Sequence, residues 1–272
     1  MVVACCQLAP KIGDLDNNRA QALRAVEAAA AQGARVVLLP ELCSSGYVFR
    51  DAAEARSLAE PADGPTTTGW AEAARAHDVI VIGGFAERDG DVLRNSAALV
   101  DASGVRAVYR KAHLWDREPL VFTPGDDPPP VVETDRGRIG VMVCYDLEFP
   151  EWVRLPALAG AQLLAAPANW PAGPAALDGI SGEGLRARAN ACVNRMFVAV
   201  CDRYGHERGV DWVGGSMVVD PDGRVLAGPP PEAIEAIVAA DCDLAAADDK
   251  RTSERNDVFG DRRPELYGPV AR

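Results

Sequence analysis

The chain has 272 residues, of which 48% are hydrophobic and 25% are charged, the balance of a soluble globular protein with a full core. Its 40 acidic residues outnumber its 28 basic ones, which gives a net charge of −12 at pH 7. Such a surface repels phosphate backbones and anionic membranes. Nucleic acid and membrane surfaces are therefore not expected among its partners.

The cysteines and the start of the chain indicate where the protein resides. The sequence opens with MVVACCQLAP, which runs into a strand without a basic region or an apolar signal core. The seven cysteines form no CxxC pair and have no zinc-like spacing to the three histidines. These features predict reduced thiols, no metal and a cytoplasmic protein.

One uncharged stretch, between Arg154 and Asp178, is long enough to raise the question of a membrane span. Several prolines and polar residues within it would interrupt a spanning helix. We therefore expect a buried strand followed by a loop.

Apolar periodicity and turn residues predict alternating strands, hairpins and helices. In chain order we expect a strand over 2–8, a helix over 17–32, a strand over 36–39, a helix over 66–77, a strand over 79–85, and a hairpin of 93–100 with 105–109. A hairpin of 131–134 with 139–143 follows, then a helix beginning near 150, a strand over 163–166, a helix over 181–193, a strand over 197–201, a hairpin of 216–219 with 224–226, and a strand over 236–242. No linker or repeat divides the chain, so we expect one α/β domain over 1–272 with two packed sheets and outer helices.

Three chemically complementary residues each follow directly after a predicted strand: Glu41, Lys111 and Cys144. In sheets flanked by helices, ligands gather beyond the carboxyl ends of the strands, so these side chains are expected to converge. A carboxylate can take the proton of a thiol, and an ammonium favours the thiolate and later an oxyanion. The backbone N–H of Tyr145 is a natural second donor to that oxyanion.

Each of these residues also has an ordinary explanation when it is taken alone. A cysteine at a strand end is most often a small core residue, and a glutamate after proline most often lies in a solvated turn. A Cys–His hydrolase that uses His113 is an alternative, but it requires the imidazole to reach Cys144. The joint occurrence of the three residues favours the catalytic interpretation with Lys111.

Three segments resemble, in order and spacing, the signatures of the nitrilase superfamily of carbon–nitrogen hydrolases. They read LLPELCSSGY, YRKAHLWDRE with FTPGD, and GVMVCYDLEFPE. The resemblance covers nearly the whole chain and implies that the family's catalytic triad falls on Glu41, Lys111 and Cys144. It implies that an additional glutamate, which positions the substrate, falls on Glu118.

The same resemblance implies a four-layer αββα sandwich with no metal and no organic cofactor. It also implies a homodimer or higher homo-oligomer, with the C-terminal tail of about 250–272 at the interface. Many members carry Arg-Ala-x-Glu-Asn on the helix after the nucleophile, whereas residues 190–194 of this chain read NACVN. A contact of that helix is therefore expected to differ from the family's pattern.

The residues after the cysteine bear on the substrate. Family branches that bind carboxylate-bearing substrates usually place an arginine two to four residues after the cysteine, where this chain has Leu147 and Glu148. A glutamate repels an anion, and with a net charge of −12 nothing compensates at long range. Neutral or cationic substrates are therefore favoured, and we expect Trp115, Asn169 and Trp170 to line the same pocket as Glu148.

The resemblance leaves the choice between amide and nitrile open. The nitrile-specialised branch usually has Trp then Glu after the cysteine, whereas Cys-Tyr-Asp is common among amidases. The favoured hypothesis is an amidase that cleaves a small neutral amide to a carboxylic acid and ammonia through a cysteine thioester. A nitrilase acting on small nitriles is the second hypothesis, and a catalytically silent scaffold of the same fold is the third.

Overall fold

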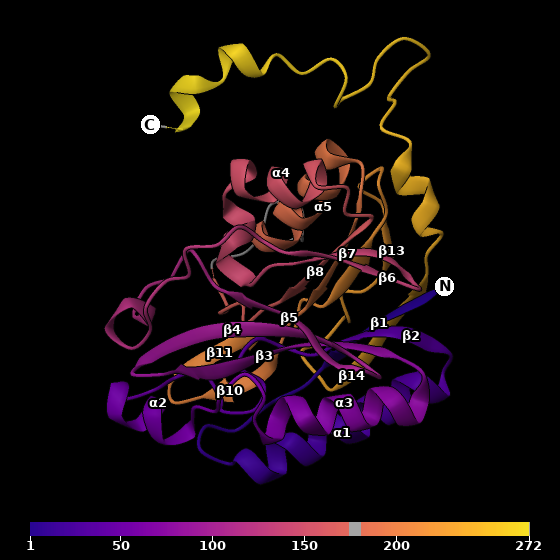
Figure 1. The fold of residues 1–272 in the computed structure, drawn as a ribbon. Helices are drawn as coiled ribbons and strands as arrows, with labels where there is room; N and C mark the ends of the chain where they lie inside the picture. Colours follow the sequence, from indigo (N-terminus) through magenta and orange to yellow (C-terminus); the bar gives the residue numbers. More distant parts are fainter. Residues whose placement is uncertain (174–180, 272) are drawn as a thin grey trace.

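Residues 1–173 and 181–271 are described by a computed structural model, in which two six-stranded sheets pack face to face between outer helices (Figure 1). Helices α1 and α3 lie beneath one sheet, and helices α4 and α5 lie above the other. The predicted four-layer αββα sandwich is confirmed.

The first sheet has the strand order β14-β1-β2-β3-β4-β5. Neighbours among β1, β2 and β3 are parallel, and the other pairs are antiparallel. Its strands are β1 (Val2–Gln7), β2 (Ala34–Leu38), β3 (Ile80–Asp89), β4 (Val92–Asp101), β5 (Gly104–Arg110) and β14 (Ala236–Asp241). Parallel neighbours need crossover connections, which here contain the helices α1 (Leu15–Ala31), α2 (Ala52–Leu58) and α3 (Pro65–His77).

The second sheet has the order β13-β12-β9-β8-β7-β6, with β7, β8 and β9 parallel. Its strands are β6 (Val131–Thr134), β7 (Gly137–Val141), β8 (Leu163–Pro167), β9 (Phe197–Cys201), β12 (Met217–Val219) and β13 (Val225–Ala227). The helices α4 (Pro150–Leu158) and α5 (Gly182–Asn194) lie on the crossovers from β7 to β8 and from β8 to β9.

The apolar runs of the central strands are explained by burial on both faces. On β1, Val3 and Cys5 belong to the core between the sheets, whereas Ala4 and Cys6 face the helix layer. Alternate residues of a strand point to opposite faces, so a strand covered on both sides has no polar face. In the core between the first sheet and its helices, Trp70 of α3 is fully buried.

The structure contains short elements that the sequence interpretation did not include, among them a helix, a hairpin and a 3₁₀ helix. Helix α2 begins after Asp51, whose side chain accepts a hydrogen bond from the Glu54 N–H. The segment between the expected strand over 197–201 and the expected hairpin of 216–219 contains a further hairpin of β10 (Tyr204–Glu207) and β11 (Val210–Val213). A 3₁₀ helix, η2 (Cys144–Glu148), separates β7 from α4. These elements are short, so hydrophobic periodicity has too few residues to reveal them.

The C-terminal tail leaves the body of the protein and extends away from the layers (Figure 1). It contains short 3₁₀ helices and exposes Leu266, Tyr267 and Val270. The uncharged stretch after α4 forms β8 and the loop that follows, and part of that expected loop, 174–180, lies outside the described residues. Among the described residues, no helix combines the length and apolarity that crossing a bilayer requires.

Candidate active site

Glu41, Lys111 and Cys144, the three residues that follow predicted strands, are all buried. Glu41 lies just beyond β2, Lys111 follows β5, and Cys144 begins η2 after β7. Glu41 is 0% exposed, Lys111 is 1% exposed and Cys144 is 8% exposed. Two of them therefore come from one sheet and the third from the other, and the charges of Glu41 and Lys111 both act on the Cys144 thiol.

Lys111 is held between two carboxylates. Its Nζ lies 2.7 Å from Glu41 Oε1 and 2.8 Å from Glu118 Oε1. Asn95, on β4, donates through Nδ2 to the same two oxygens at 2.7 and 3.3 Å. The other carboxylate oxygen of Glu41, Oε2, is buried without a hydrogen-bond partner among the described residues. An unpartnered oxygen on a buried carboxylate is an available proton acceptor.

The environment of this cluster shifts the pKa of both catalytic candidates. Burial raises the pKa of Glu41 to about 7, although the nearby Lys111 ammonium acts to lower it. Burial alone would lower the pKa of Lys111, but Glu118 and Glu41 outweigh it and raise that pKa well above its usual value. The two carboxylates therefore favour the charged ammonium, whereas Glu41 is a carboxyl group that can exchange a proton near neutral pH.

Cys144 occupies a strained position at the start of η2. Its φ of 47° lies in the left-handed region, which non-glycine residues seldom adopt and which clusters at functional sites. Burial and Glu41 raise the pKa of the thiol well above its usual value, while Lys111 lowers it. Lys111 thus acts in the expected direction, but burial dominates, so the resting group is a thiol that needs a base.

Asp146 connects the cysteine turn to the strand that delivers Lys111. Its carboxylate accepts from the Tyr109 hydroxyl at 2.7 Å and from the backbone N–H groups of Val143 and His113 at 3.3 and 3.1 Å. The His113 ring places Nδ1 2.7 Å from the same carboxylate and stacks on Phe149. These partners hold the imidazole, so the Cys–His alternative gains no support.

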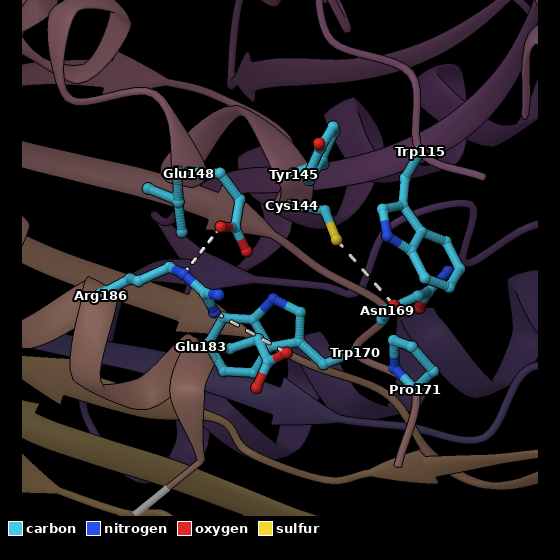
Figure 2. A pocket seen from close by; sticks show the side chains of 10 residues that line it. Trp115, Cys144, Tyr145, Glu148, Asn169, Trp170, Pro171, Glu183 and Arg186 are labelled. Carbon is cyan, nitrogen blue, oxygen red and sulfur yellow. Dashed lines mark hydrogen bonds and ion pairs between the residues drawn. The ribbon is translucent and has the colours of Figure 1, made fainter. Parts of the chain in front are cut away.

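Cys144 lines a pocket (Figure 2). Its described walls leave about 50 Å³, where a single water needs ~10–15 Å³ on the same measure. The described walls therefore leave room for more than one water-sized group. The pocket is lined by Trp115, Cys144, Tyr145, Leu147, Glu148, Asn169, Trp170, Pro171, Glu183 and Arg186.

The two sides of the pocket differ in chemistry. Figure 2 shows Glu148 and Arg186 on one side of Cys144, with Trp115 and Asn169 on the other. Asn169 donates through Nδ2 to the Glu41 carbonyl at 2.9 Å, and its own carbonyl lies 3.9 Å from the Cys144 sulfur. Asn169 thus connects its side of the pocket to the backbone of Glu41.

A local positive charge lies against Glu148, in addition to the long-range field that the sequence expectation considered. Arg186, on α5, places Nε 2.7 Å from Glu148 Oε2, and its Nη1 lies 3.9 Å from Glu183. Burial raises the pKa of Glu148, and the nearby arginine acts in the opposite direction. The sequence interpretation missed this pair because the two residues lie on different elements and only the fold brings them together.

Three further residues of the site have no catalytic signature in the sequence. Asn95 bonds to both carboxylates, and Tyr47 donates its hydroxyl to Glu118 Oε1 at 2.6 Å. Gly84, on β3, packs directly beneath the Glu41 loop, with its N–H donating to the Pro40 carbonyl. An added Cβ at Gly84 would lie 2.5 Å from Glu41 Cα. Tyr47 lies within the first motif, which is the signal that could have identified it.

Comparison with known proteins decides the family. The family model described as carbon–nitrogen hydrolase matches residues 2–252. The chain belongs to the carbon–nitrogen hydrolase family. The resemblance drawn from the three motifs is therefore confirmed, and the protein is a hydrolase of carbon–nitrogen bonds other than peptide bonds.

Relatives of this hydrolase carry both amidase and nitrilase names. It is 38% identical over 268 residues to a protein named nitrilase from Pyrococcus abyssi, covering 97% of this chain and 98% of the other. It is 35% identical over 272 residues to an (R)-stereoselective amidase from a Pseudomonas species, covering 98% and 93%.

A solved structure shows the same architecture with a modified cysteine. A mutant amidase from Nesterenkonia sp. AN1 is 28% identical to this hydrolase, with a TM-score of 0.82 over 99% of each chain. In that structure acrylamide has added to the active-site cysteine. The carbon–nitrogen hydrolase described here has the same fold, with a cysteine at the base of its pocket.

We predict that Gly84→Ala displaces the Glu41 loop. The new Cβ meets backbone atoms of Glu41 and Leu42 at 2.5 Å, which no side-chain rotation can relieve. Overpacking of this kind costs about 1–3 kcal/mol in the free energy of unfolding. Chemical denaturation should report this loss, and hydrolytic activity should fall by more than the unfolded fraction explains.

Gly69→Ala on α3 is the matched control. The nearest atom to its added Cβ is a Leu23 methyl at 3.8 Å, an ordinary contact. Alanine in a helix interior should raise the free energy of unfolding by about 0.4–1 kcal/mol. Equal effects of the two substitutions would show that the Gly84 contact does not position Glu41.

Proposed function

We propose that this hydrolase is an amidase that cleaves a small neutral amide to a carboxylic acid and ammonia through a thioester on Cys144. The observation that carries the proposal is the buried thiol at the base of a small pocket, beside a carboxyl group with a pKa near neutrality and a fixed ammonium. These are the three groups that acyl transfer to a thiol requires.

Acylation begins when Glu41 removes the proton from the Cys144 thiol. The sulfur attacks the amide carbon, and the Lys111 ammonium stabilises the resulting oxyanion. The Tyr145 N–H is the second donor, since the first N–H groups of a helix have no intrahelical acceptor. Glu41 then returns its proton to the amide nitrogen, the C–N bond breaks, and ammonia leaves the thioester.

Deacylation uses the same groups with water as the nucleophile. Glu41 takes a proton from the attacking water, and Lys111 again stabilises the oxyanion. Collapse of the tetrahedral intermediate breaks the C–S bond, releases the carboxylic acid and returns the proton to the sulfur. Glu118 holds Lys111 in place and contributes to positioning the substrate. The overall reaction converts one amide and one water to one acid and one ammonia.

Nitrile hydrolysis is the second candidate because the Pyrococcus abyssi relative is named a nitrilase. Support for the amide comes from the Cys-Tyr-Asp sequence at the nucleophile and from relatives named amidases. Ammonia release from paired amides and nitriles with the same acyl group separates the two. Turnover of nitriles alone would overturn the amidase proposal.

A homodimer and a cytoplasmic location are inferred alongside this activity. The outer surfaces of α4 and α5 expose Leu155, Leu158, Leu185 and Val193, and the extended tail adds Leu266 and Val270. Exposed apolar residues gathered on one layer are typical of an association surface. The seven free thiols suit a reducing compartment.

We predict that Cys144→Ala abolishes turnover while the protein stays folded. The thiol is the covalent partner, so its removal leaves no nucleophile, whereas the alanine fills most of the same volume. Mass spectrometry of the wild-type protein with an amide substrate should show an acyl adduct on the peptide that contains Cys144. Residual turnover by Cys144→Ala, or an adduct on another cysteine, would contradict the mechanism.

The pH dependence should follow the ionisation of Glu41. Its pKa is raised to about 7, mainly by burial, so it is protonated and cannot act as a base in more acidic solution. We expect kcat/KM to rise about tenfold per pH unit below 7 and to level off above it. A profile that stays flat between pH 5 and pH 8 would show that Glu41 is not the base.

The Glu148–Arg186 pair should make the rate of hydrolysis depend on the charge of the substrate. The pocket wall carries Glu148, Glu183 and Arg186, which leaves one excess negative charge. Partly exposed charges interact by about 0.2–1 kcal/mol, so a neutral amide should be preferred to a matched ω-carboxylate amide by only a few-fold.

We predict that Arg186→Gln widens this preference and that Glu148→Arg reverses it. The first variant removes the cation of this wall, and the second replaces an acid with a base. The ratio of kcat/KM for the neutral and anionic amides is the measurement. An unchanged ratio in both variants would mean that these residues form a surface ion pair without contact to the substrate.

A further inference from the structure

A buried ion pair at the hairpin of β10 and β11 takes no part in the chemistry described above. Arg203 is 1% exposed and Glu207 is 6% exposed, and their side chains meet with Nη1 3.2 Å from Oε2. Arg203 also donates to the Pro10 carbonyl at 2.7 Å and lies over the Trp212 ring at 4.8 Å. A buried pair adds little net stability compared with apolar residues, so its presence calls for another reason.

Glu207 is bonded to the loop that follows the Glu41 motif. Its Oε2 accepts from the backbone N–H groups of Tyr47 and Val48 at 2.9 and 2.7 Å. An added Cβ at Gly46 would lie 2.8 Å from its Oε1, so the loop approaches this carboxylate closely. A charged acceptor shared by two neighbouring N–H groups fixes the backbone of Tyr47.

Tyr47 passes this constraint to the catalytic cluster. Its hydroxyl donates to Glu118 Oε1 at 2.6 Å, and the same oxygen lies 2.8 Å from Lys111 Nζ. The ring packs edge-to-face against Trp212 at 5.2 Å between centroids, the same indole that Arg203 covers. An unbroken series of contacts therefore runs from Arg203 to the ammonium.

We propose that Arg203 and Glu207 are positioning residues of the active site, which act through Tyr47 to hold Glu118 and Lys111 in place. Glu118 Oε1 accepts hydrogen bonds from the Lys111 ammonium, the Tyr47 hydroxyl and the Asn95 amide. Its location therefore sets where the ammonium lies. The ammonium must meet an oxyanion that exists only in the transition state, and errors of about 1 Å cost roughly 10²-fold in rate. The inference rests on the proposed amidase activity where it is tested by kcat. The rate of Cys144 alkylation tests it without that activity.

The test is a double-mutant cycle on Tyr47→Phe and Glu207→Gln. Tyr47→Phe removes a single oxygen and keeps the ring against Trp212, so it tests the contact with little risk to folding. Glu207→Gln removes the charge that fixes the Tyr47 backbone. For each variant, kcat and KM on a primary amide, the melting temperature and the rate of Cys144 alkylation by iodoacetamide are measured.

Each single variant should lower kcat by about ten- to a hundredfold and change KM by less than about threefold. Because both substitutions break the same series of contacts, the double variant should be no slower than the slower single variant. Cys144 alkylation, followed on its own peptide, should also slow, since a less firmly held ammonium stabilises the thiolate less. The proposal would be overturned if the kcat losses of the two single variants multiplied in the double variant. It would also be overturned if Tyr47→Phe had the kcat of the wild type.

Glu54→Gln, on helix α2, is the matched control, because Glu54 pairs with the turn of the same hairpin. Glu54 pairs with Arg208 at 2.7 Å, next to Glu207 in the chain, and does not bond to Tyr47. It should lower the melting temperature and leave kcat within about twofold of the wild type. A loss of kcat as large as that of Glu207→Gln would show that the hairpin acts through stability alone.

The two proposals fail in different ways. If the wild-type protein hydrolyses no amide, the proposed function fails, and Cys144 alkylation still reports whether Tyr47 and Glu207 affect the thiol. If amides are hydrolysed and neither variant changes kcat or alkylation, the positioning proposal fails alone.

Discussion

The burial of the Lys111 ammonium between two carboxylates is the constraint on which the site depends. Removing an ammonium from water costs several kcal/mol, and only close opposite charges offset this cost. Glu41 and Glu118 supply them at 2.7 and 2.8 Å, but two carboxylates then share one cation. The raised pKa of Glu41 follows mainly from that burial, so the arrangement that encloses Lys111 also leaves Glu41 as a carboxyl group that can exchange a proton near neutral pH.

The fold holds this cluster from three directions. Gly84 of β3 lets the Glu41 loop lie directly on the strand, and Asp146 ties the cysteine turn to the segment that follows β5. Tyr47 reaches Glu118 from the loop that Glu207 holds. Each support joins elements that are distant in the sequence, which is how a buried charged group is kept at one position.

Strand positions and the principal catalytic candidates could be predicted from the sequence because their signals are local. An apolar run that ends in a reactive residue is visible in ten residues, and the αββα layers follow from the order of such runs. Asn95 and Tyr47 were missed because they act over 54 and 71 positions on Glu41 and Glu118. The short hairpin of β10 and β11 was missed because its polar residues show no apolar alternation.

By itself the sequence determined the family, the layers and which residues carry a thiol, an ammonium and a carboxylate to the strand ends. Only the tertiary structure decided the charge states of those groups and the charge balance of the pocket. Burial holds Cys144 as a thiol, and Arg186 offsets Glu148 from another helix. The physical reason is that pKa values and charge repulsion depend on distances and on exclusion of water, which have no signature in neighbouring residues.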